Sequence, residues 1–429
     1  MEIYVVQPGD NIYSIAERYH ISVEKLAYDN GVAPPYNLVV GQALIIVHPK
    51  LTHIVQQGDT LQSIASMYDV PVMQIIRNNQ FLSEREFLYS GDTLTISYDT
   101  KRSITTNGFA YPFIRQETLL RTLPYLTYLS IFNYTIQEGG AIESFHDDTE
   151  IVNVTKAYGT LPLLMVTTVN RQGTPNIELT YRILLNEEYQ DRIIAAFLEI
   201  VKNKGYMGAN LVLNNLTEDN QLLYQNFIQK VASRLQEEQL QLFITINYSA
   251  EEEDRAATFE NIDYLKLSTY VNGVVFLHLN WGTIDTPPAP VSNIEHIRAL
   301  INYVTASIPP DKIIIGKPTL GYDWQLPFIP GSSSVSSLTI NSALDLAYQT
   351  GAIIEFDENS QTPFYYYMQF GIELPLQHIV WFVDVRSIDA LNKIIMEYGL
   401  GGSGIWNIMI YYAPLWTIIN AEFDIIKLF

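Results

Sequence analysis

The sequence predicts an α/β protein in which a parallel (β/α)8 barrel, with a small insertion before its last strand, follows two small βααβ modules. A motif near the N-terminus is repeated once, and after it short apolar runs alternate with helical patterns. With 48% apolar and 17% charged residues among 429, the chain is able to bury a large core. The predicted boundaries are residues 1–49 and 50–98 for the modules and 108–429 for the barrel, with the insertion at about 321–381.

The repeat defines the two modules. Ile3–Ala16 matches His53–Ala65, and the offset from Gly9 to Gly58 is 49 residues. Each copy reads as a strand, a Gly-Asp turn, two short helices and a closing strand. The closing strands are expected at Ala43–Val47 and Thr93–Ser97.

Beyond a polar junction at Ser97–Gly108, β-rich apolar runs alternate with helical segments. Such runs indicate strands buried on both faces, which occur in parallel sheets covered by helices. Seven clear strands and a weak one over about 320 residues fit a closed barrel better than an open sheet. The expected strands are Leu126–Tyr134, the weak Ile151–Lys156, Leu161–Val169, Gly208–Leu213, Leu240–Ile246, Gly273–Leu279, Lys312–Pro318 and Gly402–Ile408. The expected helices are Asn186–Lys204, Asn220–Glu238, Ile294–Ser307 and Ser387–Tyr398.

Charge and residue usage exclude several classes of function. Lys and Arg number 25 against 46 Asp and Glu, a net charge of −21, so no nucleic-acid partner is expected. The absence of cysteine excludes disulfides and thiolate metal sites, and the 7 histidines are scattered, so neither a metal nor another cofactor is expected. The N-terminus lacks the basic and apolar regions of a signal peptide, and no apolar stretch is long enough for a membrane span.

Both modules resemble the LysM family, small βααβ domains that bind glycans containing N-acetylglucosamine. The signature V-x-x-G-D-[ST]-L-x-x-I-A is matched closely in both copies, and Asn11 and Ile12 are the departures in the first. The later Asn and the closing G-[QD]-x-L-x-I also occur in both. The resemblance implies a sugar between the first strand–helix turn and the loop after the second helix. The implied residues are Gly9, Asp10, Asn11, Ile12, Asn30 and Pro34, and in the second copy Gly58, Asp59, Thr60, Leu61, Asn79 and Phe81.

The same residues have an alternative, structural explanation. Asp, Asn and Thr are side chains that cap helix N-termini, and the other residues shape turns. Asp10 or Asn11, and Asp59 or Thr60, are therefore the expected caps. For Asp10 and Asp59, capping is favoured over sugar binding.

The rest of the chain resembles glycoside hydrolase family 18, in the subgroup of spore-associated, LysM-bearing N-acetylglucosaminidases that act on peptidoglycan. The segments that carry the resemblance are Gly205-Tyr206, Gly321–Trp324, Trp381–Ser387 and Gly404–Trp406. The resemblance implies a TIM barrel whose fourth strand has the motif D-x-x-D-x-D-x-E. In the family, the Glu protonates the leaving oxygen, and the Asp two residues before it orients the substrate's own acetamide for attack on the anomeric carbon.

The chain departs from this motif. Its fourth strand has Met207, Asn210, Val212 and Asn214 at the four motif positions, so no carboxylate remains there. An amide has no proton to give at neutral pH, and valine cannot accept the acetamide N–H. On the sixth strand, the family pattern M-x-Y-[DE]-W is replaced by Leu277-His278-Leu279-Asn280-Trp281.

Other residues are candidates for a replacement acid or for a sugar platform. Glu218 and Asp219 follow the fourth strand, where a role as helix-start charges is favoured. Asp323 and Asp384 lie in preserved segments near the predicted mouth. Flat rings at strand ends offer apolar surface to a sugar. The expected platform residues are Trp281, Tyr322, Trp324 and Trp406.

Two functions remain open. The favoured one is a non-catalytic protein that binds peptidoglycan or a chitin-like glycan, because position 214 is an amide. The alternative is a family 18 N-acetylglucosaminidase that hydrolyses peptidoglycan with a non-standard acid. By analogy with the subgroup, the protein is expected on a spore or in a cell wall, and otherwise in the cytoplasm. No membrane or protein partner is indicated.

Overall fold

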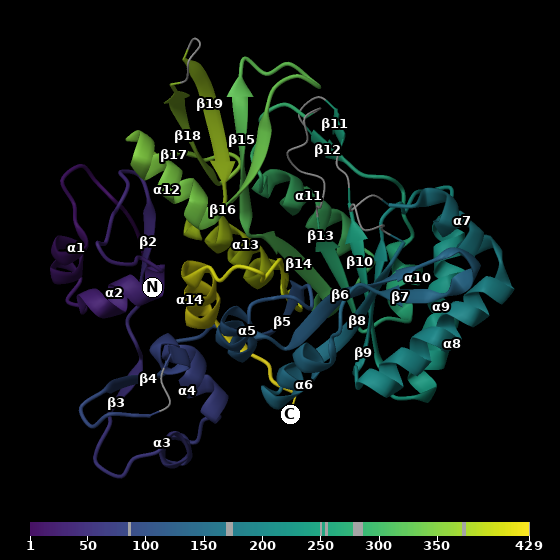
Figure 1. Ribbon diagram of the computed structural model, residues 1–429, viewed down its shortest axis with the longest axis horizontal. Helices are drawn as coiled ribbons and strands as arrows, with labels where there is room; N and C mark the ends of the chain where they lie inside the picture. The colour runs from purple at the N-terminus through teal and green to yellow at the C-terminus, as the bar shows by residue number, and fades with distance from the viewer. Residues whose placement is uncertain are drawn as a thin grey trace.

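A computed structural model of the chain describes residues 1–84, 87–168, 175–248, 251–253, 256–277, 286–370 and 375–428. Two small N-terminal modules lie to one side of a larger α/β barrel, and a separate antiparallel sheet stands beside the barrel (Figure 1). This arrangement confirms the predicted fold class.

Each module is a two-stranded antiparallel sheet packed against two helices. The first contains β1 (Glu2–Val5), α1 (Ile12–Arg18), α2 (Val23–Asn30) and β2 (Ala43–Ile46), and the second contains β3 (Leu51–Ile54), α3 (Leu61–Tyr68), α4 (Val72–Asn78) and β4 (Thr93–Ser97). Apolar residues three and four apart on the helices meet the closing strand. Each module therefore has its own small core, which includes Ile12, Ile15 and Leu44 in the first and Ile64, Ile75 and Leu94 in the second.

Eight parallel strands form a closed barrel, because β5 pairs with both β20 and β6. In order around the barrel, the strands are β5 (Arg102–Ala110), β6 (Tyr128–Ile136), β8 (Leu161–Thr167), β9 (Gly208–Leu213), β10 (Gln241–Asn247), β13 (Gly273–Leu277), β14 (Ile313–Pro318) and β20 (Gly402–Trp406). Alternate residues of each strand point into the barrel. Short strands β7 (Ile142–Ser144) and β21 (Phe423–Ile425) pair with β6 and β5, respectively, and β11 (Glu251–Glu253) and β12 (Ala256–Thr258) form a separate two-stranded sheet.

Two predictions for the barrel are wrong. The segment Ile151–Lys156 is not a strand but part of helix α6 (Thr149–Ala157). The missing strand is β5, most of which lies in the segment that was expected to be a polar junction. Thr106 and Asn107 gave β5 a polar appearance, yet both are fully buried. Their side chains hydrogen-bond inside the protein, and Thr106 Oγ1 donates to the Tyr125 carbonyl at 2.5 Å.

Helices cover the outside of the barrel (Figure 1). The four predicted helices are confirmed as α8 (Glu187–Lys204), α9 (Gln221–Glu237), α11 (Ile294–Val304) and α13 (Val385–Tyr398). The others around the barrel are α5 (Gln116–Thr122), α6, α7 (Ile177–Leu185), α10 (Tyr264–Thr269) and α14 (Ala413–Glu422). Within the described part of the chain, no helix has the length and apolarity needed to cross a membrane.

The insertion before the last barrel strand forms its own sheet. Its five antiparallel strands lie in the order β16 (Val335–Thr339), β15 (Leu320–Leu326), β19 (Leu376–Phe382), β18 (Thr362–Gln369) and β17 (Glu355–Asp357). Helix α12 (Ile340–Thr350) packs on one face, where the hydroxyl of Tyr365 donates to the Ala343 carbonyl at 2.7 Å. Tyr322, Trp381 and Phe364 pair directly across three strands, so they share the opposite face.

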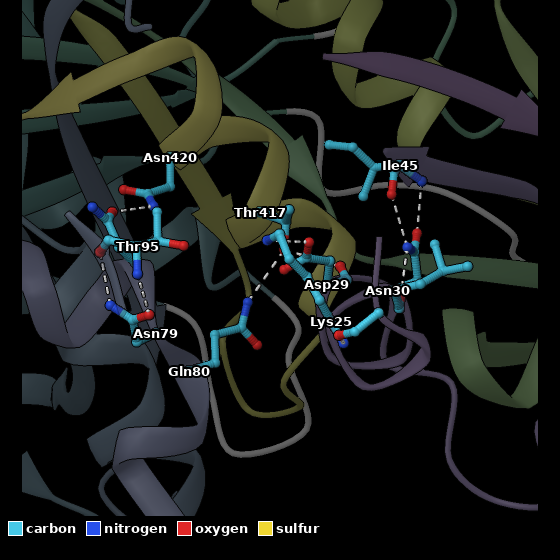
Figure 2. A network of polar contacts seen from close by, with 12 residues as sticks. Lys25, Asp29, Asn30, Ile45, Asn79, Gln80, Thr95, Thr417 and Asn420 are labelled. Carbon is cyan, nitrogen blue, oxygen red and sulfur yellow. Dashed lines mark hydrogen bonds and ion pairs between the residues drawn. The ribbon is translucent and has the colours of Figure 1, made fainter. Parts of the chain in front are cut away.

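Helix α14 joins both modules to the barrel, and all of its residues are buried. Thr417 Oγ1 donates to the Asp29 carbonyl of the first module at 2.9 Å and accepts from Gln80 Nε2 of the second at 3.2 Å (Figure 2). Asn420 accepts from Arg77 Nε at 3.0 Å and donates to Asn78 Oδ1 at 2.7 Å. One helix of the barrel therefore holds the two modules together.

The first module also contacts the insertion. The Ile354 N–H donates to the Val40 carbonyl at 3.0 Å. Gly41 next to it has φ +86°, and a Cβ there would lie 1.9 Å from the Ile354 carbonyl oxygen. Only glycine fits this close approach.

A fully buried lysine lies between β14, α13 and α14. Lys317 Nζ donates to Asn392 Oδ1 and, at 2.8 Å, to Ser403 Oγ. Asn392 in turn donates to Glu422 at 2.8 Å. Burial lowers the pKa of Lys317 to about 7, although the charges of Glu422 and Asp389 oppose this shift.

Candidate functional site

The interior of the barrel is apolar beside strand β9. Val212 and Met207 pack against a cluster from the surrounding strands. The buried members of this cluster are Phe109, Tyr128, Leu161, Leu163, Met165, Phe243, Val275, Leu277 and Ile314. A carboxylate at position 212 would face apolar side chains in this structure, so the side chain that is present matches its surroundings.

Asn210 lies deeper in the barrel, within a fully buried polar layer. Its Nδ2 donates to Ser130 Oγ at 3.0 Å, and its Oδ1 accepts from Thr245 Oγ1 at 2.8 Å. Ser130 Oγ also donates to Asn107 Oδ1 at 3.0 Å. The four side chains bridge β5, β6, β9 and β10 with neutral groups alone. This layer therefore specifies packing and holds no acid or base.

Asn214 follows directly after the end of β9. Its Nδ2 donates to Thr167 Oγ1, at the end of the neighbouring strand β8, at 3.1 Å. Glu218 and Asp219, the nearest carboxylates along the chain, are exposed. They lie in the loop directly before Asn220, the N-cap of α9, and no acidic residue lies in the first turn of that helix, so their role as helix-start charges stays a prediction.

The carboxylates of the preserved segments are engaged by other side chains. Asp323 accepts from the Tyr367 hydroxyl at 2.7 Å and lies 2.9 Å from His378 Nδ1. Its neighbours in register are Val380 and Tyr365, so it lies on the α12 face of the insertion sheet, opposite to Tyr322. Asp384 caps α13 and binds Arg386 at 2.7 Å. Neither geometry directs a free carboxyl toward Asn214.

Three of the four predicted platform rings are described. Trp406 is half-buried at the end of β20, with its ring 5.4 Å from that of Phe109. Tyr322 is half-buried, and its ring lies 5.6 Å from that of Trp324. Trp324 is only 2% exposed, and its Nε1 donates to the Thr286 carbonyl at 3.2 Å. The fourth ring, Trp281, lies outside the described residues, as do Leu279 and Asn280.

Two aromatic residues that were not among the predicted platform rings lie beside Tyr322. Trp381 and Phe364 are half-buried, and their rings lie 4.6 Å apart. With Tyr322 they form a row of three rings across β15, β19 and β18. Trp381 could have been predicted, because it lies within a segment that carried the family resemblance. The position of Phe364 beside it follows only from the pairing of β18 with β19.

In the modules, Asn11 and Thr60 are the helix caps. Asn11 accepts from the Ser14 N–H at 3.0 Å, and Thr60 accepts from the Ser63 N–H at 3.0 Å. The capping role expected for Asp10 and Asp59 is wrong, because each lies one residue before the cap. Each closes the preceding turn instead, by accepting a main-chain N–H three residues earlier, at 2.8 and 2.7 Å.

Both Asp side chains also tie the turn to the first strand of the module. Asp10 accepts from the Tyr4 hydroxyl, and Asp59 lies 2.9 Å from His53 Nε2. The hydrogen bond from Tyr4 is the main cause that lowers the pKa of Asp10, and the Gln56 N–H is the main cause for Asp59. Both carboxylates are therefore ionised at neutral pH.

Asn30 and Asn79 join the second helix of each module to its closing strand. Asn79 Nδ2 donates to the carbonyls of Ile75 and Thr95 at 2.8 Å each, and its Oδ1 accepts from the Thr95 N–H at 2.8 Å. Asn30 repeats the pattern with Leu26 and Ile45 (Figure 2). Both side chains are buried and both amide N–H bonds are used, which gives them a structural role.

The remaining predicted module residues differ in exposure. Gly9, Gly58 and Pro34 are exposed, Leu61 and Phe81 are half-buried, and Ile12 is buried in the module core. Gly9 and Gly58 have φ +90° and +96°, and a Cβ at either would meet nothing within 4 Å. The turn between the first strand and the first helix is thus open to solvent in both modules.

Comparison with known proteins identifies the family. Residues 173–409 match glycosyl hydrolases family 18, and residues 4–47 and 53–97 match the LysM domain. The chain belongs to glycosyl hydrolases family 18. Its barrel carries two LysM domains at the N-terminus, as the sequence resemblance implied.

The similarity to relatives covers the whole chain. A cortical fragment-lytic enzyme of Bacillus anthracis is 29% identical over 433 residues, which span 100% of this chain and 99% of the relative. The crystal structure of the Bacillus cereus spore cortex-lytic enzyme SleL has a TM-score of 0.80 at 29% identity and covers 99% of this chain and 98% of that chain. SleL of Bacillus megaterium gives a TM-score of 0.79 at 28% identity, with the same coverage.

In this family 18 barrel, the fourth strand is β9. Counting from β5, the strands β6, β8 and β9 follow in order, so positions 210 and 212 lie on the strand where the family motif is expected, and position 214 lies directly after it. Asn210 is buried in the polar layer, Val212 lies in the apolar cluster, and Asn214 reaches the neighbouring strand end.

Proposed function

We propose that this protein binds glycans that contain N-acetylglucosamine, of the peptidoglycan or chitin type, and that its family 18 barrel is not catalytic. The observation that carries the proposal is the side chain at position 214. The family's proton donor is replaced there by an amide that donates to Thr167. An amide gives up no proton to a leaving oxygen at neutral pH.

The second half of the catalytic arrangement is also replaced. In the family's mechanism, the acetamide of the substrate attacks the anomeric carbon and is oriented by a carboxylate two residues before the acid. Val212 occupies that position and packs in the apolar cluster. General acid catalysis contributes about 10²–10⁴-fold, and residues that act as a unit lose far more when several are absent.

The two LysM domains support the binding half of the proposal. They match their family over most of their length, and their strand–helix turns are exposed. The relatives named above are a cortical fragment-lytic enzyme and two spore cortex-lytic enzymes. We therefore place the protein on a spore or in a cell wall, with the LysM domains in contact with the glycan.

An active hydrolase is the second candidate, and one observation favours it. The relatives that match over the whole chain are named for lytic activity. This candidate requires a carboxyl group from elsewhere that reaches the scissile oxygen. Asp323 and Asp384 are engaged by His378 and Arg386, so either of these two carboxylates would have to leave its partner to act as the acid.

One experiment with two measurements tests the proposal. The full-length chain is mixed with insoluble peptidoglycan and with chitin, and the sedimented fraction is measured with and without soluble N-acetylglucosamine oligomers as competitor. The same preparation is assayed for release of N-acetylglucosamine between about pH 4 and pH 8, because the pKa of a carboxylic acid catalyst lies at about 4 or above. We expect competed sedimentation without turnover. Steady turnover with a bell-shaped pH profile would establish the hydrolase instead.

A further inference from the structure

A cleft lies between the two LysM domains, on the side of α2 in the first and of β3 and β4 in the second. Its volume is about 730 Å³, which is within the range of small-ligand sites. We call it the inter-module cleft. The turns Gly9–Ile12 and Gly58–Leu61, which the LysM resemblance implies, do not contribute to its described lining, whereas Asn79 and Phe81 of the second implied set do.

We propose that the inter-module cleft is an additional glycan-binding site that takes a neutral N-acetylated sugar. This inference rests on the proposed function, because it assigns a further contact to the same class of glycan. It differs from that function in its location, since the cleft exists only where both domains are held side by side.

The walls of the cleft are held in place by the barrel. Asp29 and Gln80, which both line the cleft, are joined by Thr417 of α14 (Figure 2). Asn78, another lining residue, is held by Asn420 of the same helix at 2.7 Å. A preformed site loses little conformational entropy when a ligand enters. The separation of the two walls is therefore set before the sugar arrives.

The lining combines aromatic surface with small polar groups, as sugar sites require. Tyr28 projects from α2 and is 38% exposed, and its ring lies 6.5 Å from that of Phe81 in the other domain. Ser22, Thr52 and Thr93 contribute hydroxyl groups to the same lining. Rings offer apolar area to a sugar face, while hydroxyl groups exchange hydrogen bonds with its hydroxyl and amide groups.

The charges of the cleft favour a neutral sugar. Among its described lining residues Lys25 is the only cation, and its Nζ lies 2.8 Å from the Asp29 carboxylate, which neutralises it. Glu24 and Asp92 add two further carboxylates, and Asp92 accepts a hydrogen bond from the Tyr89 N–H at 2.9 Å. A glycan with free carboxylates is repelled from such a surface, whereas N-acetylglucosamine oligomers are not.

The test measures binding of the N-acetylglucosamine tetramer to the full-length protein by titration calorimetry. Tyr28→Ala removes the ring from the cleft, and Thr93→Trp fills the cleft from an exposed strand position. Tyr348→Ala, at a tyrosine of α12 that is 50% exposed, is the matched control. Both cleft variants should lose one binding site per chain or weaken it by about tenfold, which is ~1.4 kcal/mol. The control should bind as the unaltered protein does.

The outcomes separate this inference from the proposed function. If the unaltered protein binds the tetramer and both cleft variants retain its affinity and stoichiometry, the cleft is not a site and the proposed function stands. If the unaltered protein binds no oligomer, the proposed function fails, and the cleft proposal fails with it. A tetramer-length glycan with free carboxylates should bind the cleft about fivefold more weakly. Equal binding in the cleft would overturn the preference for a neutral sugar.

Discussion

Replacement of Asn79 by alanine should destabilise the second LysM domain rather than remove a sugar contact. The side chain makes three hydrogen bonds of 2.8 Å to main-chain groups and is 4% exposed. Each such bond contributes about 0.5–1.5 kcal/mol, and an unpaired buried group costs about 1–3 kcal/mol. We expect the free energy of unfolding of this domain to fall by about 3 kcal/mol.

Amide hydrogen exchange at Thr95 measures this loss directly, because its N–H donates to Asn79 Oδ1. Gln74→Ala is the matched control in the same domain. It removes one hydrogen bond to the Ile96 carbonyl, which Asn78 also satisfies at 2.8 Å, so the loss should stay below about 1 kcal/mol. If Asn79→Ala abolished glycan binding while exchange at Thr95 stayed unchanged, Asn79 would be a sugar contact and the structural reasoning would be refuted.

Three further predictions follow from other contacts. The stability of Lys317→Met relative to the unaltered protein should increase as the pH falls from 10 to 7. The pKa of Lys317 is about 7 in the folded state and 10.5 in the unfolded state, so between these values the unfolded state binds more protons. Lowering the pH across this window therefore destabilises the unaltered protein but not the variant. The change should be on the order of 3 kcal/mol, checked by thermal unfolding at both pH values; equal shifts at pH 7 and 10 would contradict it. Gly41→Ala should lower the free energy of unfolding by ~2 kcal/mol more than Gly9→Ala does. Both positions have positive φ, but only a Cβ at Gly41 would meet an atom, the Ile354 carbonyl oxygen, at 1.9 Å. Limited proteolysis and thermal unfolding compare the two variants, and identical behaviour would exclude the contact. Asn214→Glu alone should not produce turnover, because Val212 still provides no clamp for the acetamide; activity of this single variant in an N-acetylglucosamine release assay would show that the rest of the site is intact.

Much of the fold could be predicted because it depends on local pattern. The limits of β9 and β4 are those predicted, and the repeat located both modules. The errors arise where burial depends on distant partners. Thr106 and Asn107 look like junction residues until the barrel closes around them, and Ile151–Lys156 has the composition of a strand but packs as a helix.

The candidate site was predicted in part for the same reason. Strand periodicity gave the inward positions of β9 without a structure. It could not give the hydrogen bonds that occupy Asn79, or the face on which Asp323 lies, because both depend on residues 16 to 55 positions away in the chain. The row formed by Tyr322, Trp381 and Phe364 likewise requires the pairing of three strands.

The large separation in sequence between α14 and the LysM domains has a consequence for synthesis. The LysM domains leave the ribosome before the barrel and have cores of their own, so they are able to fold before it. The helix that fixes them relative to each other is made more than 300 residues later, since Asn78 and Asn420 are separated by 342 positions. Until α14 is made, the two LysM domains are connected only by the chain between them. Synthesis of α14 turns them into one rigid pair, so a nascent chain that lacks α14 and a chain that contains it should engage the same glycan with different geometry.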